Sequence, residues 1–152
     1  DTGFDNMFAA YEALPAATRA KIDTMKTANV KISSSRLKSA NRDVLAEQIA
    51  LGEPPVIHPL VRTHPERGTK AIWFHTGKTE NIEGMDPTKT QEFLRGLLKE
   101  SAKPEFSYTH EWTLGDLLIV DNRSALHKAG SDYDMSQHRM LYRTMVRGDR
   151  PY

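Results

Sequence analysis

The sequence has no cysteine, no long apolar run and no excess of either charge. Without cysteine, disulfides and thiolate metal sites are excluded, and any metal must be held by histidine, carboxylate or water. No apolar run approaches the roughly 20 residues that span a bilayer, and no signal-peptide pattern opens the chain. The 21 basic and 20 acidic residues nearly cancel, which argues against a nucleic-acid partner or a membrane surface. We therefore expect a cytoplasmic protein with neither partner.

The N-terminal third of the chain favours helices followed by an insert. Apolar residues at helical spacing predict a helix over residues 5–14. Pro15 suits the first turn of a second helix over residues 15–26. Residues 27–53 contain no aromatic residue and carry three consecutive serines, so we expect an insert with a short helix near 42–51. A mobile lid and a disordered segment are both compatible with this composition.

From residue 54 onward the pattern is typical of β structure. A helix is predicted over residues 87–101, and Phe106 to Trp112 show the clearest alternation of the chain. The predicted strands span residues 56–61, 71–74, 106–112, 117–120 and 138–146, and the fourth is expected to be buried on both faces. Short strands with a few outer helices predict a single domain over residues 1–152, mainly β with flanking helices (α+β), a sandwich or jelly roll.

The most chemically specific residues are His127, Arg139 and Arg143. Side chains alternate between the two faces of a strand, so both arginines lie on one face of the last predicted strand. If that face points inward, the guanidiniums need anionic partners, because an unpaired buried charge is costly, and their planar forks would bind a carboxylate or sulfonate. If it points outward, both are solvated, and the pattern does not decide between the two. His127 follows a very apolar segment. Taken alone, such a histidine is more often a hydrogen-bonded structural residue than a metal ligand.

Several motifs occur in an order that resembles a known family. Towards the C-terminus stand Trp-Thr-Leu-Gly-Asp at 112–116, Val-Asp-Asn-Arg-Ser at 120–124, His127, and the segment 139–151. Upstream stand the segments 58–65, 82–85 and 9–14, and the chain opens with Asp1-Thr2. Together they resemble the taurine/2,4-D dioxygenase family of iron(II)- and 2-oxoglutarate-dependent oxygenases. The resemblance implies a double-stranded β-helix, also called a jelly roll.

The resemblance also implies a role for four residues. His127 corresponds to the distal histidine ligand of Fe(II). Arg139 corresponds to the partner of the distal carboxylate of 2-oxoglutarate, the co-substrate, and Thr2 to a residue that hydrogen-bonds the same carboxylate. Arg143 corresponds to the residue that holds the sulfonate or carboxylate of the primary substrate. The implied activity uses dioxygen to hydroxylate a small anionic organic molecule, releasing succinate and CO2.

The chain departs from the family pattern at the other two iron ligands. In the family they come from a His-x-Asp pair that precedes the segment resembled by Asp1-Thr2, and no His-x-Asp occurs in this sequence. We therefore expect the C-terminal portion of a dioxygenase whose jelly roll is incomplete on its N-terminal side. The alternative is a truncated, catalytically inactive homologue that acts as an anion-binding or subunit-interaction module. Open sheet edges favour association, so we expect a homo-oligomer.

Two further positions are ambiguous. Lys78 stands where many relatives carry an aromatic residue near the substrate, and it either indicates a more polar substrate or points to solvent. His64-Pro65-Glu66 formally matches a His-x-acid metal pair. Because it lies in a Pro/Gly-rich turn, we interpret it as structural.

Overall fold

The computed structural model describes residues 1–30, 54–130, 134, 136, 140–148 and 150–152. Within these ranges the chain is mostly strands with a few helices. The strands are β1 (Thr2–Asn6), β2 (Lys26–Asn29), β3 (Val56–Pro59), β4 (Val61–Thr63), β5 (Lys70–Ile72), β6 (Thr79–Ile82), β7 (Ser107–His110) and β8 (Ala125–Ala129). The helices are α1 (Met7–Glu12), α2 (Ala16–Ile22), α5 (Pro87–Ser101) and a 3-10 turn, Pro104–Phe106. None of these helices has the length and apolar character that a membrane crossing requires.

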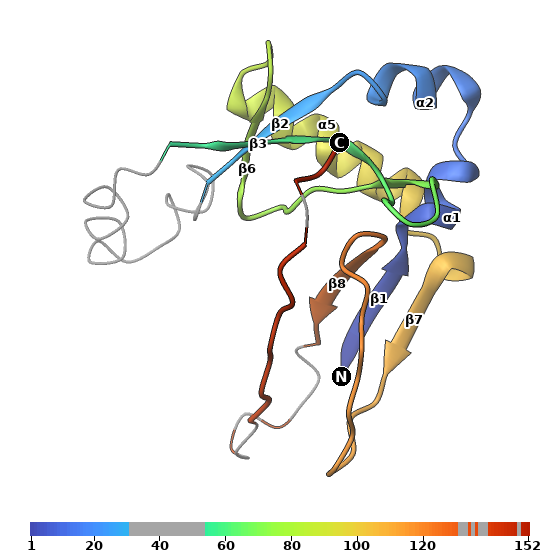
Figure 1. Cartoon of the computed structure of the whole chain (residues 1–152), viewed down its shortest axis with the longest axis vertical. Helices are drawn as coiled ribbons and strands as arrows, with labels where there is room; N and C mark the ends of the chain where they lie inside the picture. Colours follow the sequence, from blue (N-terminus) through green and yellow to red (C-terminus); the bar gives the residue numbers. More distant parts are fainter. Residues whose placement is uncertain (31–53, 131–133, 135, 137–139, 149) are drawn as a thin grey trace.

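The described strands form three antiparallel sheets that do not close into a barrel. Their orders are β7-β1-β8, β3-β2-β6 and β4-β5, and Figure 1 shows β1 between its two partners. In the first sheet, β1 pairs with two strands that lie more than 100 residues later in the chain. The sheet therefore forms only when the start of the chain meets its last third.

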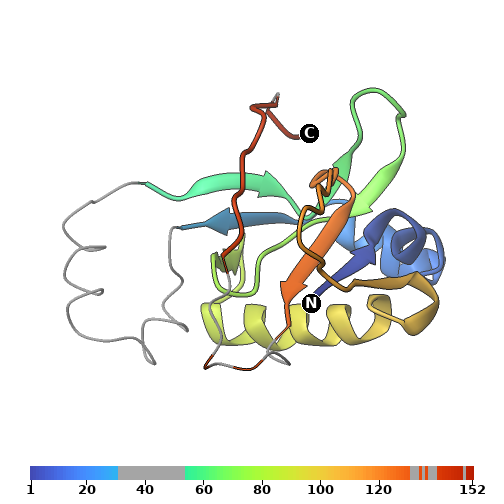
Figure 2. The ribbon, with the colours of Figure 1, turned by 90° about the horizontal axis from the view of Figure 1, so that it is seen from below.

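Helix α5 is specified by local signals and packs against the core. The Asp86 side chain accepts a hydrogen bond from the Lys89 N–H at 3.0 Å, and Pro87 follows the cap, a favoured start for a helix. Its inner face buries Leu94 and Leu97, and the helix runs along one side of the strands (Figure 2). Other core side chains come from α1, α2, the strands and the residues that directly follow or link them: Met7, Ala10, Tyr11, Leu14, Ile22, Leu60, Val61, Ala71, Ile72, Phe74 and Ile82.

Two predicted strands are not formed in the part of the chain that the structure describes. Residues 117–120 were expected to be buried on both faces, but Leu117 is 87% and Ile119 is 89% exposed, and the segment has no strand partner among the described residues. Of the strand predicted over 138–146, residues 140–146 are described; they are exposed and form no ladder. These predictions were wrong because an apolar run becomes a strand only where a neighbour satisfies its backbone groups.

Most other predicted elements are present with shifted bounds. The helix over 87–101 agrees with α5, whereas the helix over 5–14 begins only after β1. The strands at 56–61, 71–74 and 106–112 correspond to β3 with β4, β5 and β7, while β2, β6 and β8 were not expected. The insert predicted over 27–53 begins with β2, and its remainder from residue 31 lies outside the described residues. The assignment of a single domain stays a prediction.

Candidate functional site

The register of the β7-β1-β8 sheet places Thr2 and His127 on the same face. Phe4 lies opposite His127, and Thr2 lies opposite Ala129. Since side chains alternate along a strand, Thr2, Phe4 and His127 share one side of the sheet. Thr2 and His127 are thus diagonal neighbours, which lie roughly 7–8 Å apart in such ladders. Two residues that are 125 positions apart (127 − 2) in the sequence are brought together by strand pairing.

His127 lies within β8 and is exposed. Its ring contacts the Phe4 ring, with centroids 6.0 Å apart. Its side chain has neither a hydrogen bond nor an ion pair to the described part of the chain, so the hydrogen-bonded structural role finds no support there. A neutral imidazole with a free nitrogen fits one coordination position of Fe(II). No group of three His, Asp or Glu side chains gathers among the described residues. The histidine therefore fits the metal as one ligand, and the other ligands would have to come from outside the described residues.

Thr2 is 9% exposed, and its hydroxyl is oriented by an indole. The Nε1–H of Trp112 donates to the Thr2 Oγ1 atom at 2.9 Å. A hydroxyl that accepts one hydrogen bond still has its own proton to donate. The Thr2 O–H can therefore serve an acceptor on the open side of the site, such as a carboxylate. Sequence reasoning missed Trp112, although its alternation with Tyr108 and His110 already placed the three on one face.

The turn after Trp112 is held by Asp116. Its carboxylate accepts from the Thr113 backbone N–H at 2.9 Å and from the Thr113 hydroxyl at 2.8 Å. It also lies 3.2 Å from the Nε2 atom of His110, whose ring meets Trp112 edge-on at 4.6 Å. The backbone hydrogen bond from Thr113, followed by its side-chain hydrogen bond, lowers the pKa of Asp116. These contacts hold the indole in the position from which it donates to Thr2.

The described residues do not test the roles predicted for the two arginines. Arg139 lies outside the described residues. Arg143 is exposed, and it forms no ion pair with the described residues. The roles of both arginines therefore stay predictions, as does the choice between an inward and an outward arginine face. Lys78 is exposed in the turn before β6, which agrees with the solvent interpretation.

His64 is buried, 5% exposed, and both of its ring nitrogens are engaged. The Nδ1 atom accepts from the backbone N–H groups of Glu66 and Arg67, each at 3.3 Å. The Nε2 atom lies 2.8 Å from Oδ2 of Asp121. A nitrogen that accepts two N–H groups offers no free lone pair to a cation, which agrees with the structural interpretation of His64-Pro65-Glu66.

An open cavity of about 500 Å³ lies beside the sheet. Phe4 and Tyr108 line it from the strands, and residues 118–121 line it from the following loop. Phe8 and Arg67 lie at its edge, with the guanidinium 5.8 Å from the ring centroid. The lining combines aromatic and aliphatic side chains with a similar number of polar ones, and its aromatic part can contact an apolar or aromatic group. Phe4 belongs both to this cavity and to the contact with His127.

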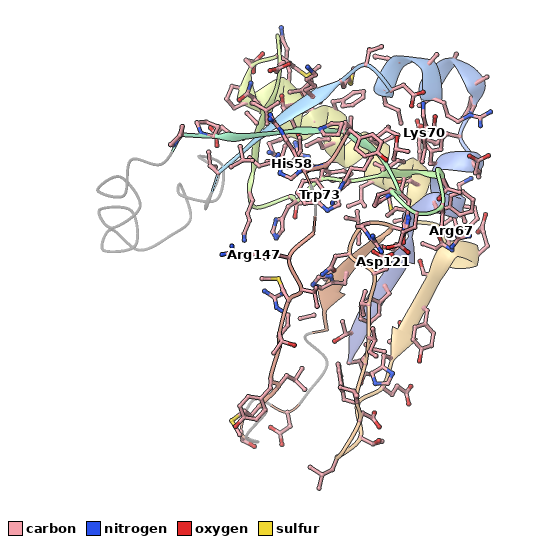
Figure 3. All side chains as sticks on the ribbon, in the orientation of Figure 1. His58, Arg67, Lys70, Trp73, Asp121 and Arg147 are labelled. Carbon is pink, nitrogen blue, oxygen red and sulfur yellow. The ribbon has the colours of Figure 1, made fainter. Side chains whose placement is uncertain are left out.

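His58 and Arg62 pack on Trp73, away from the His127 sheet. The His58 and Trp73 rings are stacked with centroids 4.8 Å apart. Both residues are labelled in Figure 3. The Arg62 guanidinium lies 5.5 Å from the indole centroid. Burial lowers the pKa of His58, and the charges of Arg62 and Arg150 lower it further. We assign this neutral, stacked histidine to packing of β3–β5 rather than to chemistry.

Comparison with known proteins places these features in a family. The model of the taurine catabolism dioxygenase TauD, TfdA family matches residues 1–145. The α-ketoglutarate-dependent 2,4-dichlorophenoxyacetate dioxygenase of Cupriavidus pinatubonensis is 35% identical over 149 residues, covering 98% of this chain and 50% of that protein. The (S)-phenoxypropionate/α-ketoglutarate dioxygenase of Sphingobium herbicidovorans is 32% identical over 152 residues, covering 97% and 52%. The chain thus spans about half the length of the curated relatives it matches.

Solved structures support the same relationship. The structure of AAD-2 in complex with Mn(II) and N-oxalylglycine is 33% identical, with a TM-score of 0.75, over 90% of this chain and 52% of that one. A taurine dioxygenase from Burkholderia xenovorans is 26% identical, with a TM-score of 0.63, over 83% of this chain and 39% of that one. The prediction of a mainly β fold with flanking helices, an incomplete jelly roll, is confirmed by these likenesses and by the open sheets.

Proposed function

Since the chain belongs to the TauD, TfdA family of dioxygenases, we propose that the protein containing it is an Fe(II)- and 2-oxoglutarate-dependent dioxygenase. It hydroxylates a small anionic organic substrate. In the balanced reaction, 2-oxoglutarate, dioxygen and a substrate C–H bond give succinate, CO2 and a C–OH bond. The observation that carries the proposal is the shared face of His127 and Thr2, with the Thr2 hydroxyl oriented by Trp112.

His127 is the residue of this chain that would hold the iron. Its imidazole is exposed beside Phe4 and would supply one of the three protein ligands that such an iron needs. When bound, Fe(II) supplies the activation of dioxygen and the oxidation of the co-substrate. The protein's part is to place co-substrate and substrate beside the metal in a fixed orientation.

Thr2 and Arg139 would hold 2-oxoglutarate by its distal carboxylate. The Thr2 hydroxyl accepts from Trp112 at 2.9 Å, so its own proton is directed elsewhere and can be donated to the carboxylate. Arg139 would add a bidentate guanidinium fork, which matches carboxylate geometry. The distal carboxylate would then be held by one neutral donor and one cation.

For the primary substrate we favour a carboxylate that carries an aromatic group. Relatives at 35% and 32% identity are named for 2,4-dichlorophenoxyacetate and (S)-phenoxypropionate, which are such carboxylates. The cavity lined by Phe4, Phe8 and Tyr108 has the aromatic surface that such a ring requires. Arg143 would pair with the carboxylate. Sulfonates are the competing class, since a relative at 28% identity is named for them.

The test is succinate formation by the protein that contains this chain. The assay supplies Fe(II), 2-oxoglutarate and a panel of aryloxy carboxylates and alkyl sulfonates, with His127→Ala compared to wild type. Lys128→Ala is the matched control, because Lys128 is the next residue of β8, also exposed, on the opposite face of the sheet. We expect loss of turnover in His127→Ala and not in the control. Turnover retained in His127→Ala would refute the role of His127. The inactive-homologue alternative predicts no succinate with any substrate.

A further inference from the structure

The carboxylate of Asp121 joins two segments that lie far apart in the sequence. Arg123 donates to it three times: from its backbone N–H at 2.9 Å and Nε at 2.9 Å, both to Oδ1, and from Nη2 at 3.0 Å to Oδ2. His64, which is 57 residues earlier, contributes the fourth contact at 2.8 Å. The hydrogen bonds from Arg123 in particular hold the pKa of Asp121 far below its usual range. The Asp121 carboxylate is therefore an anion whose two oxygens together make four hydrogen-bonding contacts.

The His64 end of this network is anchored in the core. His64 begins the turn between β4 and β5, where the Gly68 N–H donates to the His64 carbonyl at 2.8 Å. Gly68 has a φ of 65°, a backbone conformation that glycine adopts without strain. The adjoining strands bury Val61 and Ile72, and the Nδ1 atom of His64 is held by the turn's own N–H groups. The imidazole is thus held in one orientation, from which it contacts Asp121.

The Asp121 end leads directly into the strand that carries His127. The Asp121 carbonyl accepts from the Ser124 N–H at 3.2 Å, and the Ser124 carbonyl accepts from the Met7 N–H at 2.9 Å. Strand β8 then begins at Ala125. Figure 3 shows the Asp121 side chain where the β4–β5 turn meets this sheet.

Strand β8 needs such support because it pairs on one side only among the described residues, with β1. The side chains of a strand alternate between faces, so a slip by one residue would move His127 to the face opposite Thr2. Edge strands lack the second partner that would oppose a slip. The loop that feeds β8 is therefore the place where its register can be secured.

We propose that His64, Asp121 and Arg123 are positioning residues that fix the register of β8 and so direct His127 to the face that carries Thr2. The inference rests on the proposed function, because it takes His127 as a metal ligand. Arg123 also reaches Glu66, with Nη1 3.3 Å from Oε1, which ties the same loop to the β4–β5 turn a second time. The network acts on the metal through the backbone of residues 121–127 and does not touch it.

The first readout is metal affinity. Mn(II) binding to the protein that contains this chain is measured by calorimetry for wild type and Asp121→Asn. The expected loss is about tenfold or more, the lower end of what support residues of metal ligands contribute. Asp86→Asn is the control, since Asp86 is also a hydrogen-bonded aspartate, but its carboxylate accepts from the Lys89 N–H at the start of α5, and asparagine caps a helix equally well. Its Mn(II) affinity should stay within about twofold of wild type.

The second readout is amide hydrogen exchange, which does not depend on His127 being a ligand. Exchange of the Leu126 and Lys128 amides, which face β1, should become faster in Asp121→Asn, while exchange in β7 stays unchanged. Arg123→Lys keeps the charge and loses the fork, so it should give an intermediate change in both readouts.

Three outcomes would overturn the inference. The first is that Asp121→Asn changes neither the Mn(II) affinity nor the amide exchange of β8. The second is that neither Asp121→Asn nor Arg123→Lys folds, because the network would then support the whole fold rather than one strand. Faster exchange in β7 and β8 alike is the third. If His127→Ala leaves Mn(II) affinity unchanged, the proposed function fails at His127, and β8 exchange alone then decides the role of the network.

Discussion

The hydrogen bond from Trp112 to Thr2 gives a sharp prediction about the co-substrate. Trp112→Phe removes the indole N–H but keeps an aromatic ring beside His110. A hydrogen bond of this kind contributes about 0.5–1.5 kcal/mol. Because a factor of ten corresponds to about 1.4 kcal/mol, we expect KM for 2-oxoglutarate to rise about two- to tenfold. The value of kcat should change little, since the distal carboxylate is held equally before and during the reaction.

Thr2→Val completes the test, since valine has nearly the shape of threonine and lacks the hydroxyl. It removes the donor to the carboxylate and strands the Trp112 N–H beside a residue that is 9% exposed. Leaving a buried donor unpaired costs about 1–3 kcal/mol of stability. We therefore expect a larger rise in KM than in Trp112→Phe, together with a lower unfolding temperature. Because Trp112 acts through the Thr2 hydroxyl, the double variant should have the KM of Thr2→Val alone.

The assay is the initial rate of succinate formation against 2-oxoglutarate concentration in the protein that contains this chain. Tyr108→Phe is the matched control. Tyr108 is 59% exposed on the same strand face, and its hydroxyl lies 3.2 Å from Nδ1 of His110 rather than near Thr2. An unchanged KM in Trp112→Phe, or additive effects in the double variant, would refute the reasoning.

Three further predictions concern stability, measured by urea unfolding. Asp121 has a lowered pKa in the folded state. Its contribution to the free energy of unfolding is therefore fully present above the unfolded pKa of about 3.8 and is lost as the pH falls below that value. Asp121→Asn should flatten this loss of stability in acid. His58 also has a lowered pKa, so stability should fall as pH drops below about 6.5, where the unfolded chain binds the proton first. His58→Phe should remove that decline while keeping the stack on Trp73. Leu94→Ala should cost about 2–5 kcal/mol, and Arg95→Ala, at an exposed neighbouring position, should cost little.

Elements with local signals were predictable. Helix α5 was expected over residues 87–101 and is observed there, because Asp86 caps it, Pro87 starts it and its apolar spacing is helical. Family resemblance likewise singled out Thr2 and His127. Neither the helix nor these two residues required knowledge of their neighbours in the folded structure.

Elements that depend on a partner were not predictable. The sequence does not predict β1, of which only residues 5–6 fall in the helix expected over 5–14, and it does not predict β8, because each strand is defined by pairing with a strand more than 100 residues away. The segment 117–120 has the apolar character of a buried strand, yet Leu117 and Ile119 are exposed. Apolar character sets what a segment can bury, and a neighbour decides whether it does.

The same distinction holds for the site. The amino-acid sequence by itself determined the family, the mainly β class and the side chains that can bind iron or a carboxylate, because these follow from residue type and motif order. Only the tertiary structure decided that His127 shares a face with Thr2, that Trp112 orients the Thr2 hydroxyl, and that His64 meets Asp121. These pairs join residues 57 to 125 positions apart (121 − 64 and 127 − 2), and they are neighbours because strand register and burial bring such residues together in space.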